Sequence, residues 1–272
     1  MRQVPLIIEP DPDDPDFASV LVEATVAGRP YRLLLDTGAA RSQLDADEYT
    51  LSLRPVPGDS SSAAFGGQVT DPVVTVTDLV AGPLRVSALD VKRSEGRTGS
   101  LLGMDVLGRH RCRFRLDAGV LDLEPPDGQT SHDLLIGRRG HPYVEVHWRG
   151  VRVLACFDTG AGATVVNRAF WLDFPQLFKP IGTSVGTDAH GEQVETPLLR
   201  MKGPVIGQRG FRSHKVVAVD LSGVNSTLGY PMDLILGYPT IRQADWLFDF
   251  PARRWTVMNQ GTSGWETPQW PG

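Results

Sequence analysis

The chain has 272 residues and a formal net charge of −5 at pH 7. This acidic balance argues against nucleic acid or an anionic membrane as the main partner, and no run of about 18 apolar residues is present to span a membrane. The length fits one large domain or two domains of about 130 residues, each able to bury its own core.

The first 16 residues are rich in proline and aspartate. They lack the basic start and apolar centre of a signal peptide, and they are too short and acidic to act as a pro-segment that fills a cleft. The two cysteines, Cys112 and Cys156, lie on apolar alternating segments in different halves, where we expect buried free thiols. Together these features predict a soluble, cytoplasmic protein.

Short apolar runs separated by turn residues predict an all-β protein. The chain contains 29 glycines and 21 prolines, which divide runs rich in valine, leucine and threonine. The alternating run Val20–Val26, a turn at Gly28 and the run Tyr31–Leu35 predict a hairpin. Helical periodicity is scarce, and we expect only short helices at Met104–His110 and Pro239–Gln243, each just after a glycine.

The second run of this hairpin ends in Asp-Thr-Gly-Ala at Asp36–Ala39, and the same tetrapeptide follows the run Val151–Phe157 at Asp158–Ala161. A carboxylate that directly follows a buried strand contributes little to packing. By chance such a tetrapeptide appears in roughly one chain of this length in two hundred, and two copies are far rarer. The pair therefore points to a site made where two halves meet.

Other segments repeat with the tetrapeptide. Gly66–Pro72 and Gly191–Pro197 share the pattern Gly-x-Gln-Val-x-x-Pro, and Leu101–Gly103 matches Ile235–Gly237. A turn-rich stretch separates the two copies. We therefore predict an internal duplication with an N-terminal unit at 1–125, a linker at 126–140 and a C-terminal unit at 141–272.

Two aspartates facing each other across a two-fold site predict acid–base chemistry. Like charges raise one pKa of such a pair, so the two carboxyl groups share one proton. The ionised carboxylate can then take a proton from water while the neutral carboxyl donates to the carbonyl oxygen under attack. Gly38 and Gly160 allow close backbone approach, and the hydroxyls of Thr37 and Thr159 can brace the opposite loop.

At these residues the chain resembles the retropepsin-type aspartic proteases, in a bacterial single-chain form. The alanine after Asp-Thr-Gly and the Leu-Leu-Gly-Met-Asp segment at Leu101–Asp105 carry the resemblance. It implies an all-β fold of two homologous β-barrel lobes in pseudo-two-fold arrangement, each with a short helix after the Leu/Ile-Leu-Gly motif. It also implies an aspartic endopeptidase that acts on extended polypeptides as a monomer with an internal pseudo-dimer, without metal or organic cofactor.

The resemblance assigns roles to particular residues. Asp36 and Asp158 are the catalytic pair. The residues expected to support them are Thr37, Gly38, Ala39, Thr159, Gly160 and Ala161. Two flap hairpins, at Ala63–Val69 and Asp188–Val194, are expected to cover the substrate, with contacts from Phe65, Gly66, Gly67, Gln68, His190, Gly191 and Gln193. The two flap sequences differ, so we expect an asymmetric cleft.

Two other functions fit parts of the sequence. An actin-like nucleotide-binding protein also has Asp-x-Gly loops after strands, but it needs long crossover helices. A catalytically silent peptide-binding module would keep the cleft as a docking groove. The six histidines show no metal-ligand spacing and are expected at the surface or in turns, with only His190 near a cleft.

Overall fold

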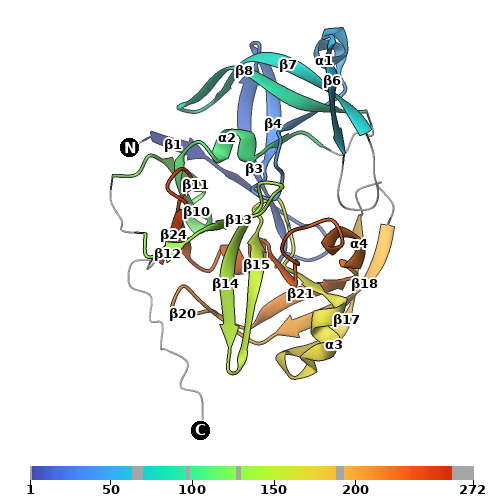
Figure 1. The fold of residues 1–272 in the computed structure, drawn as a ribbon, viewed down its shortest axis with the longest axis vertical. Helices are drawn as coiled ribbons and strands as arrows, with labels where there is room; N and C mark the ends of the chain where they lie inside the picture. The colour runs from blue at the N-terminus through green and yellow to red at the C-terminus, as the bar shows by residue number, and fades with distance from the viewer. Residues whose placement is uncertain (1, 63–69, 96–98, 127–129, 188–192, 259–272) are drawn as a thin grey trace.

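The computed structural model describes residues 2–62, 70–95, 99–126, 130–187 and 193–258. These residues form mostly β-sheet with a few short helices, which confirms the all-β class (Figure 1). Among them the longest helix, α3 (Arg168–Asp173), has six residues. The long crossover helices of an actin-like fold are therefore missing from the described part of the chain, as is any helix able to span a membrane.

Residues 7–102 supply all strands of an eight-stranded sheet with the order β2-β3-β4-β9-β5-β8-β7-β6. The strands are β2 (Ile7–Pro10), β3 (Ala18–Val26), β4 (Arg29–Leu35), β5 (Gln43–Asp45), β6 (Pro55–Ser62), β7 (Thr70–Ala81), β8 (Leu84–Ser94) and β9 (Leu101–Leu102). The labels of β6, β7 and β8 lie in the upper part of Figure 1, with β3 and β4 running down from them toward the middle.

Residues 135–236 supply a ten-stranded sheet, in which β13 pairs with β14 beside the path β17-β18-β21-β16-β22-β15-β14-β19-β20. The strands are β13 (Leu135–Ile136), β14 (Pro142–Trp148), β15 (Val151–Phe157), β16 (Val165–Asn167), β17 (Phe178–Thr187), β18 (Gln193–Met201), β19 (Val205–Ile206), β20 (Arg209–Gly210), β21 (His214–Val219) and β22 (Leu234–Leu236). Those that are labelled in Figure 1 (β13, β14, β15, β17, β18, β20 and β21) lie in its middle and lower parts.

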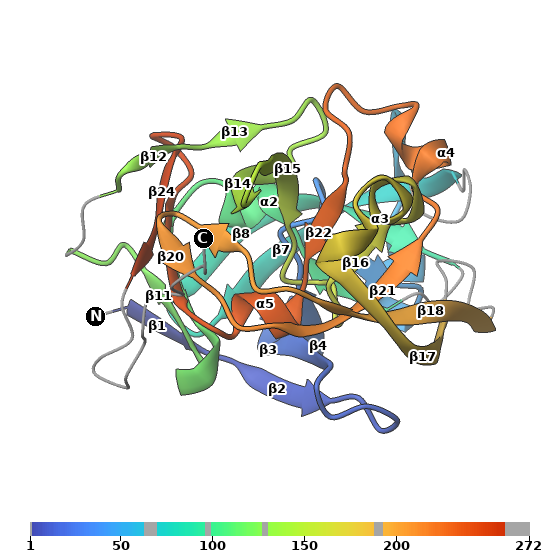
Figure 2. The same ribbon diagram turned by 90° about the horizontal axis from the view of Figure 1, so that it is seen from below.

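A six-stranded sheet with the order β1-β11-β10-β23-β24-β12 combines strands from both parts of the chain (Figure 2). The strands are β1 (Arg2–Pro5), β10 (Arg111–Arg115), β11 (Val120–Leu123), β12 (His132–Asp133), β23 (Asp245–Asp249) and β24 (Arg254–Met258). The other short helices are α1 (Glu48–Ser52), α2 (Met104–Leu107), α4 (Ser222–Asn225) and α5 (Tyr238–Ile241), with 3-10 turns at Leu116–Ala118 and Pro175–Leu177.

The predicted hairpin forms between β3 and β4. Inward residues of β3 are buried in strict alternation, and Val26 pairs with Arg29 across a two-residue turn. Ala27 and Gly28 have φ values of 48° and 75°. A turn with two positive φ values matches the twist of the strands, and glycine adopts it without strain, which explains the position of Gly28.

The six-stranded sheet ties the two parts of the chain together beneath the Asp-Thr-Gly-Ala loops. Phe114 on β10 lies opposite Trp246 on β23. The ring of Phe157, the residue before Asp158, lies 5.6 Å from that of Phe114 and 4.5 Å from that of Phe248. Such aromatic pairs add about 0.5–1.5 kcal/mol beyond the area they bury, so the end of β15 is firmly anchored.

Several local predictions can be compared with this fold. Cys112 and Cys156 are free and buried, as predicted. Both predicted helices form, but α2 and α5 stop earlier than expected. After each of them the chain continues in i→i−3 turns, for example from His110 N to Leu107 O and from Gln243 N to Thr240 O. The stretch predicted as a linker contributes the short strands β12 and β13.

Candidate active site

Two parallel strand pairs hold Asp36 and Asp158 in matching backbone settings. Asp36 follows β4, which pairs with β9, and its N–H donates to Leu102 O at 3.0 Å. Asp158 follows β15, which pairs with β22, and its N–H donates to Leu236 O at 3.1 Å. The apolar pairs before Gly103 and Gly237 thus fix the exit of each aspartate from its strand.

The same two glycines bring a helix against each loop. The N–H of Met104 donates to Ala39 O at 2.8 Å, and that of Tyr238 donates to Ala161 O at 2.9 Å. A Cβ at Gly103 would lie 2.9 Å from Ala39 O, and one at Gly237 would collide with Ala163 O. The close approach of α2 and α5 therefore requires glycine at both positions.

Thr37 and Thr159 cross-link the two loops through reciprocal hydrogen bonds. Thr37 Oγ1 donates to Phe157 O at 2.8 Å, and Thr159 Oγ1 donates to Leu35 O at 2.7 Å. Each hydroxyl also accepts from the opposite threonine N–H, at 3.0 and 3.1 Å. Both side chains are buried. Each such bond contributes about 1 kcal/mol, and losing one partner costs more because the other group stays buried and unpaired.

Gly38 and Gly160 let the backbone of each loop pack directly on the carboxyl group of the other. A Cβ at Gly38 would come closer than 3.0 Å to the Asp158 carboxylate. A Cβ at Gly160 would lie 2.5 Å from the Asp36 carboxyl carbon. No larger residue fits at either position unless a carboxyl group moves.

The carboxyl groups of Asp36 and Asp158 are neighbours, and each lies against the glycine of the opposite loop. Burial raises the pKa of both, and the neighbouring Asp158 carboxylate raises that of Asp36 further, to well above its usual value. Backbone N–H groups act in the opposite direction, including Gly160 N, which donates to Asp158 Oδ1 at 2.9 Å. Donors of this kind belong to Gly38, Ala39, Gly160 and Ala161. The balance favours one proton retained by the pair, which can then both accept and donate a proton.

The sequence reasoning missed a layer of hydroxyls behind the two loops. Ser42 Oγ donates to Asp105 Oδ1 at 2.6 Å and accepts from Gly103 N at 2.9 Å. In the other part of the chain, Thr164 Oγ1 accepts from Gly237 N at 3.2 Å. Ser42 and Thr164 each follow their aspartate by six residues, so the shared spacing of a hydroxyl was the available signal.

The partners of these hydroxyls differ. Behind Ser42 lies the carboxyl group of Asp105, whose pKa is raised by burial. Behind Thr164 lies Thr240 Oγ1 at 2.8 Å, which in turn lies 2.7 Å from Nε2 of the buried His214. The two loops are therefore supported by different chemistry.

The expectation for the histidines was wrong for two of them. His214 is buried, and so is His141, which hydrogen-bonds to the backbone of Gly38. Burial lowers the pKa of both rings, that of His214 to about 4. His141 reaches the Asp36 loop because β13 and β14 pair across the turn that precedes it, a long-range placement that no local pattern signals.

The predicted flap contacts fall mainly outside the described residues. This holds for Phe65, Gly66, Gly67, Gln68, His190 and Gly191. The strands leading to these segments pair as hairpins, with Ser62 opposite Thr70 and Thr187 opposite Gln193.

Comparison with known families finds one match to part of the chain. Residues 22–109 match the family described as gag-polyprotein putative aspartyl protease, a range that includes Asp36–Ala39 and Leu101–Gly103. This match indicates an aspartyl-protease domain in that part of the chain. Comparison with curated proteins gives no match.

Proposed function

We propose that this protein is an aspartic endopeptidase that hydrolyses peptide bonds with a water activated by Asp36 and Asp158. The observation that carries the proposal is the pair of neighbouring carboxyl groups, each packed against the glycine of the opposite loop and each with a raised pKa. Asp36 and Asp158 are both partly exposed as residues, although Asp36 Oδ1 itself is buried and has no hydrogen-bond partner among the described residues. The aspartyl-protease match over residues 22–109 supports the same reaction class.

The mechanism uses one proton on the carboxyl pair. The ionised carboxylate takes a proton from water, whose oxygen attacks the peptide carbonyl carbon, while the neutral carboxyl donates its proton to the carbonyl oxygen. The leaving nitrogen then takes a proton from the pair as the C–N bond breaks, and one hydroxyl of the tetrahedral diol returns its proton to the pair as the product carboxyl group forms. The products are a carboxyl group and an amine, and the pair again holds one proton. Either aspartate can hold that proton, because the two titrate together.

We further propose that the chain is an internally duplicated, retropepsin-like protease with units at 1–125 and 141–272 joined by 126–140. The paired settings of Asp36 and Asp158 and the reciprocal threonine bonds support this, because each feature of one loop has a counterpart in the other. Thr37, Gly38, Ala39, Thr159, Gly160 and Ala161 then hold the geometry. One chain would contain a complete site.

Digestion of a diverse peptide mixture tests the proposed function. We expect the purified protein to cleave peptides internally, with cleavage blocked by a statine-type inhibitor, which mimics the tetrahedral state. Products are identified by mass spectrometry over a wide pH range. Binding of peptides without inhibitor-sensitive cleavage at any pH would instead favour a silent peptide-binding module.

A further inference from the structure

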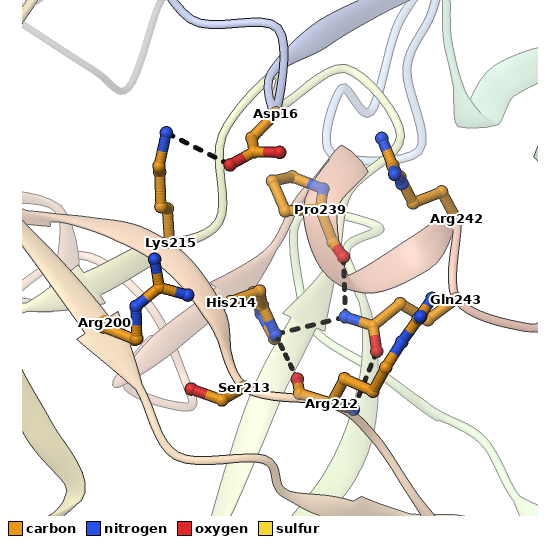
Figure 3. Close-up of a pocket in the computed structure, with 9 residues that line it drawn as sticks. All are labelled: Asp16, Arg200, Arg212, Ser213, His214, Lys215, Pro239, Arg242 and Gln243. Atoms are coloured by element: carbon orange, nitrogen blue, oxygen red, sulfur yellow. Dashed lines mark hydrogen bonds and ion pairs between the residues drawn. The ribbon is translucent and has the colours of Figure 1, made fainter. Parts of the chain in front are cut away.

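A polar pocket lies on the ten-stranded sheet beside α5, and its lining includes no residue of the two Asp-Thr-Gly-Ala loops (Figure 3). Its volume is about 260 Å³. The lining residues are Asp16, Arg200, Arg212, Ser213, His214, Lys215, Pro239, Arg242 and Gln243. Ligand pockets for drug-sized molecules start near 300 Å³, so this one suits a small ion or a small molecule.

Three cationic residues lie in register across β17, β18 and β21, and two of them, Arg200 and Lys215, line the pocket. Arg200 on β18 lies directly opposite Lys179 on β17 and directly opposite Lys215 on β21. Directly opposed residues of antiparallel strands point to the same face, where like charges destabilise the sheet. The chain as a whole has a net charge of −5, yet this face of the sheet carries three adjacent positive charges. An anion bound there would reduce their mutual repulsion.

Within the part of the chain that the structure describes, carboxylates pair with one cation of this row, Lys215. Lys215 Nζ lies 2.9 Å from Asp14 and 3.1 Å from Asp16. Figure 3 shows Arg200 between Lys215 and His214, on the side of the pocket facing Pro239. The described lining holds four cationic side chains, of Arg200, Arg212, Lys215 and Arg242, and one carboxylate, that of Asp16, with Asp14 beside Lys215. The formal charge of these residues is therefore positive.

His214 forms the buried floor of the pocket and keeps it rigid. Its Nδ1 lies 2.8 Å from Arg212 O, and Gln243 Nε2 lies 3.2 Å from the same nitrogen. Gln243 also accepts from Arg212 N at 2.8 Å and donates to Pro239 O at 2.8 Å. These bonds connect β21 to α5, so the cations project from a fixed frame.

We propose that this pocket is a binding site for the phosphate group of a small molecule. Guanidinium groups recognise phosphate by paired, charge-assisted hydrogen bonds, and a tetrahedral dianion can use several cations at once. A carboxylate offers one charge and two oxygens, so it fits this arrangement less well. Free phosphate and a phosphate monoester both present this phosphate group, so either could bind.

The site is physically connected to the Asp158 loop. His214 contacts Thr240, Thr240 contacts Thr164, and Thr164 accepts from the N–H of Gly237 behind that loop. The charged lining residues are Arg200, Arg212, Lys215, Arg242 and Asp16, of which Arg200 lowers and Asp16 raises the pKa of His214. A bound anion offsets these cations and so raises the pKa of His214 from its low value. Binding of an anion would therefore change the protonation of His214 and, with it, the hydrogen bonds from His214 through Thr240 and Thr164 to Gly237.

Calorimetric titration with inorganic phosphate at constant ionic strength tests the proposal. We expect one saturable site per chain, with acetate binding at least tenfold more weakly. Arg200→Gln should weaken phosphate binding by about tenfold or more, because it removes a charge-assisted contact. Arg85→Gln, which removes an exposed arginine of β8, should leave binding unchanged. A titration with glycerol 3-phosphate, a phosphate monoester, distinguishes the two possible ligands. Tighter binding of glycerol 3-phosphate than of inorganic phosphate would identify a phosphorylated small molecule as the ligand. Tighter binding of inorganic phosphate would identify the free ion.

Two further measurements keep the test independent of proteolytic activity. In chloride, Arg200→Gln should melt no lower than the wild type, because it relieves the row of like charges. Phosphate should raise the melting temperature of the wild type but not of this variant. The NMR titration of the His214 ring should move to higher pH in phosphate. Absence of saturable binding, equal affinity in both arginine variants, or a lower melting temperature of Arg200→Gln in chloride would overturn the proposal.

Discussion

Replacing either Asp36 or Asp158 with asparagine is expected to lower kcat/KM for peptide cleavage by at least about 10³-fold. Asparagine keeps the shape of the side chain but can neither accept a proton from water nor exchange one with its partner. General acid–base catalysis contributes about 10²–10⁴-fold, and here one pair supplies both the acid and the base. The measurement is steady-state cleavage of a peptide identified in the digestion experiment.

The same variants should remain folded. Because burial and the neighbouring carboxylate raise the pKa values of the pair, the native state binds protons more tightly than the unfolded chain. The stability from this pair is present at low pH and is lost as the pH rises through the raised pKa values. Asparagine does not ionise, so each variant should melt no lower than the wild type at pH 8.

Two controls separate catalysis from structure. Asp90→Asn changes an exposed carboxylate that accepts from Thr75, and activity should not change. Mixing the Asp36→Asn and Asp158→Asn proteins should not restore activity if each chain holds its own complete site. Full activity of either single variant would refute the two-carboxylate mechanism, and recovery on mixing would show that the active site forms between chains.

Gly38→Ala and Gly160→Ala are expected to lower kcat/KM by at least about 10²-fold. Each added methyl group would sit closer than 3.0 Å to the carboxyl group of the opposite aspartate. A displacement of about 1 Å in reacting groups costs about 10²-fold in rate, and overpacking at a tight contact destabilises by about 1–3 kcal/mol. Peptide-cleavage kinetics and denaturant unfolding measure the two effects.

Gly223→Ala is the matched control for this pair. Gly223 lies in α4, and a Cβ there would meet nothing within 4 Å. Alanine in a helix is favoured over glycine by about 0.5–1 kcal/mol, so this variant should be fully active and slightly more stable. Wild-type activity in Gly38→Ala or Gly160→Ala would mean that the loops do not pack on the two carboxyl groups as described.

The parts of the site that follow from local sequence could be predicted. The hairpin at Gly28 and the short helix after Gly103 depend on neighbouring residues and on the backbone freedom of glycine. The duplicated tetrapeptide singles out Asp36 and Asp158 as a candidate pair, and the fold brings their two loops together. Each of these features is determined by residues that are close together in the sequence.

The supporting contacts could not be predicted in the same way. His214 reaches Thr240 and Thr164 only because β21, β16 and α5 meet in the folded sheet. His141 and Gly38 lie close together in the fold although they are more than a hundred positions apart in the sequence. Isolated histidines are common on protein surfaces, so the residues next to His141 and His214 in the sequence do not indicate that these two are buried. Such contacts depend on the pairing of distant strands.

The pH dependence of kcat/KM for a cleaved peptide tests most directly whether Asp36 and Asp158 share one proton. We predict a bell-shaped profile, because at low pH both carboxyl groups are protonated and no base remains, while at high pH both are ionised and no acid remains. The raised pKa values of the pair extend the active range toward neutral pH. A profile governed by a single ionisation would contradict the shared proton.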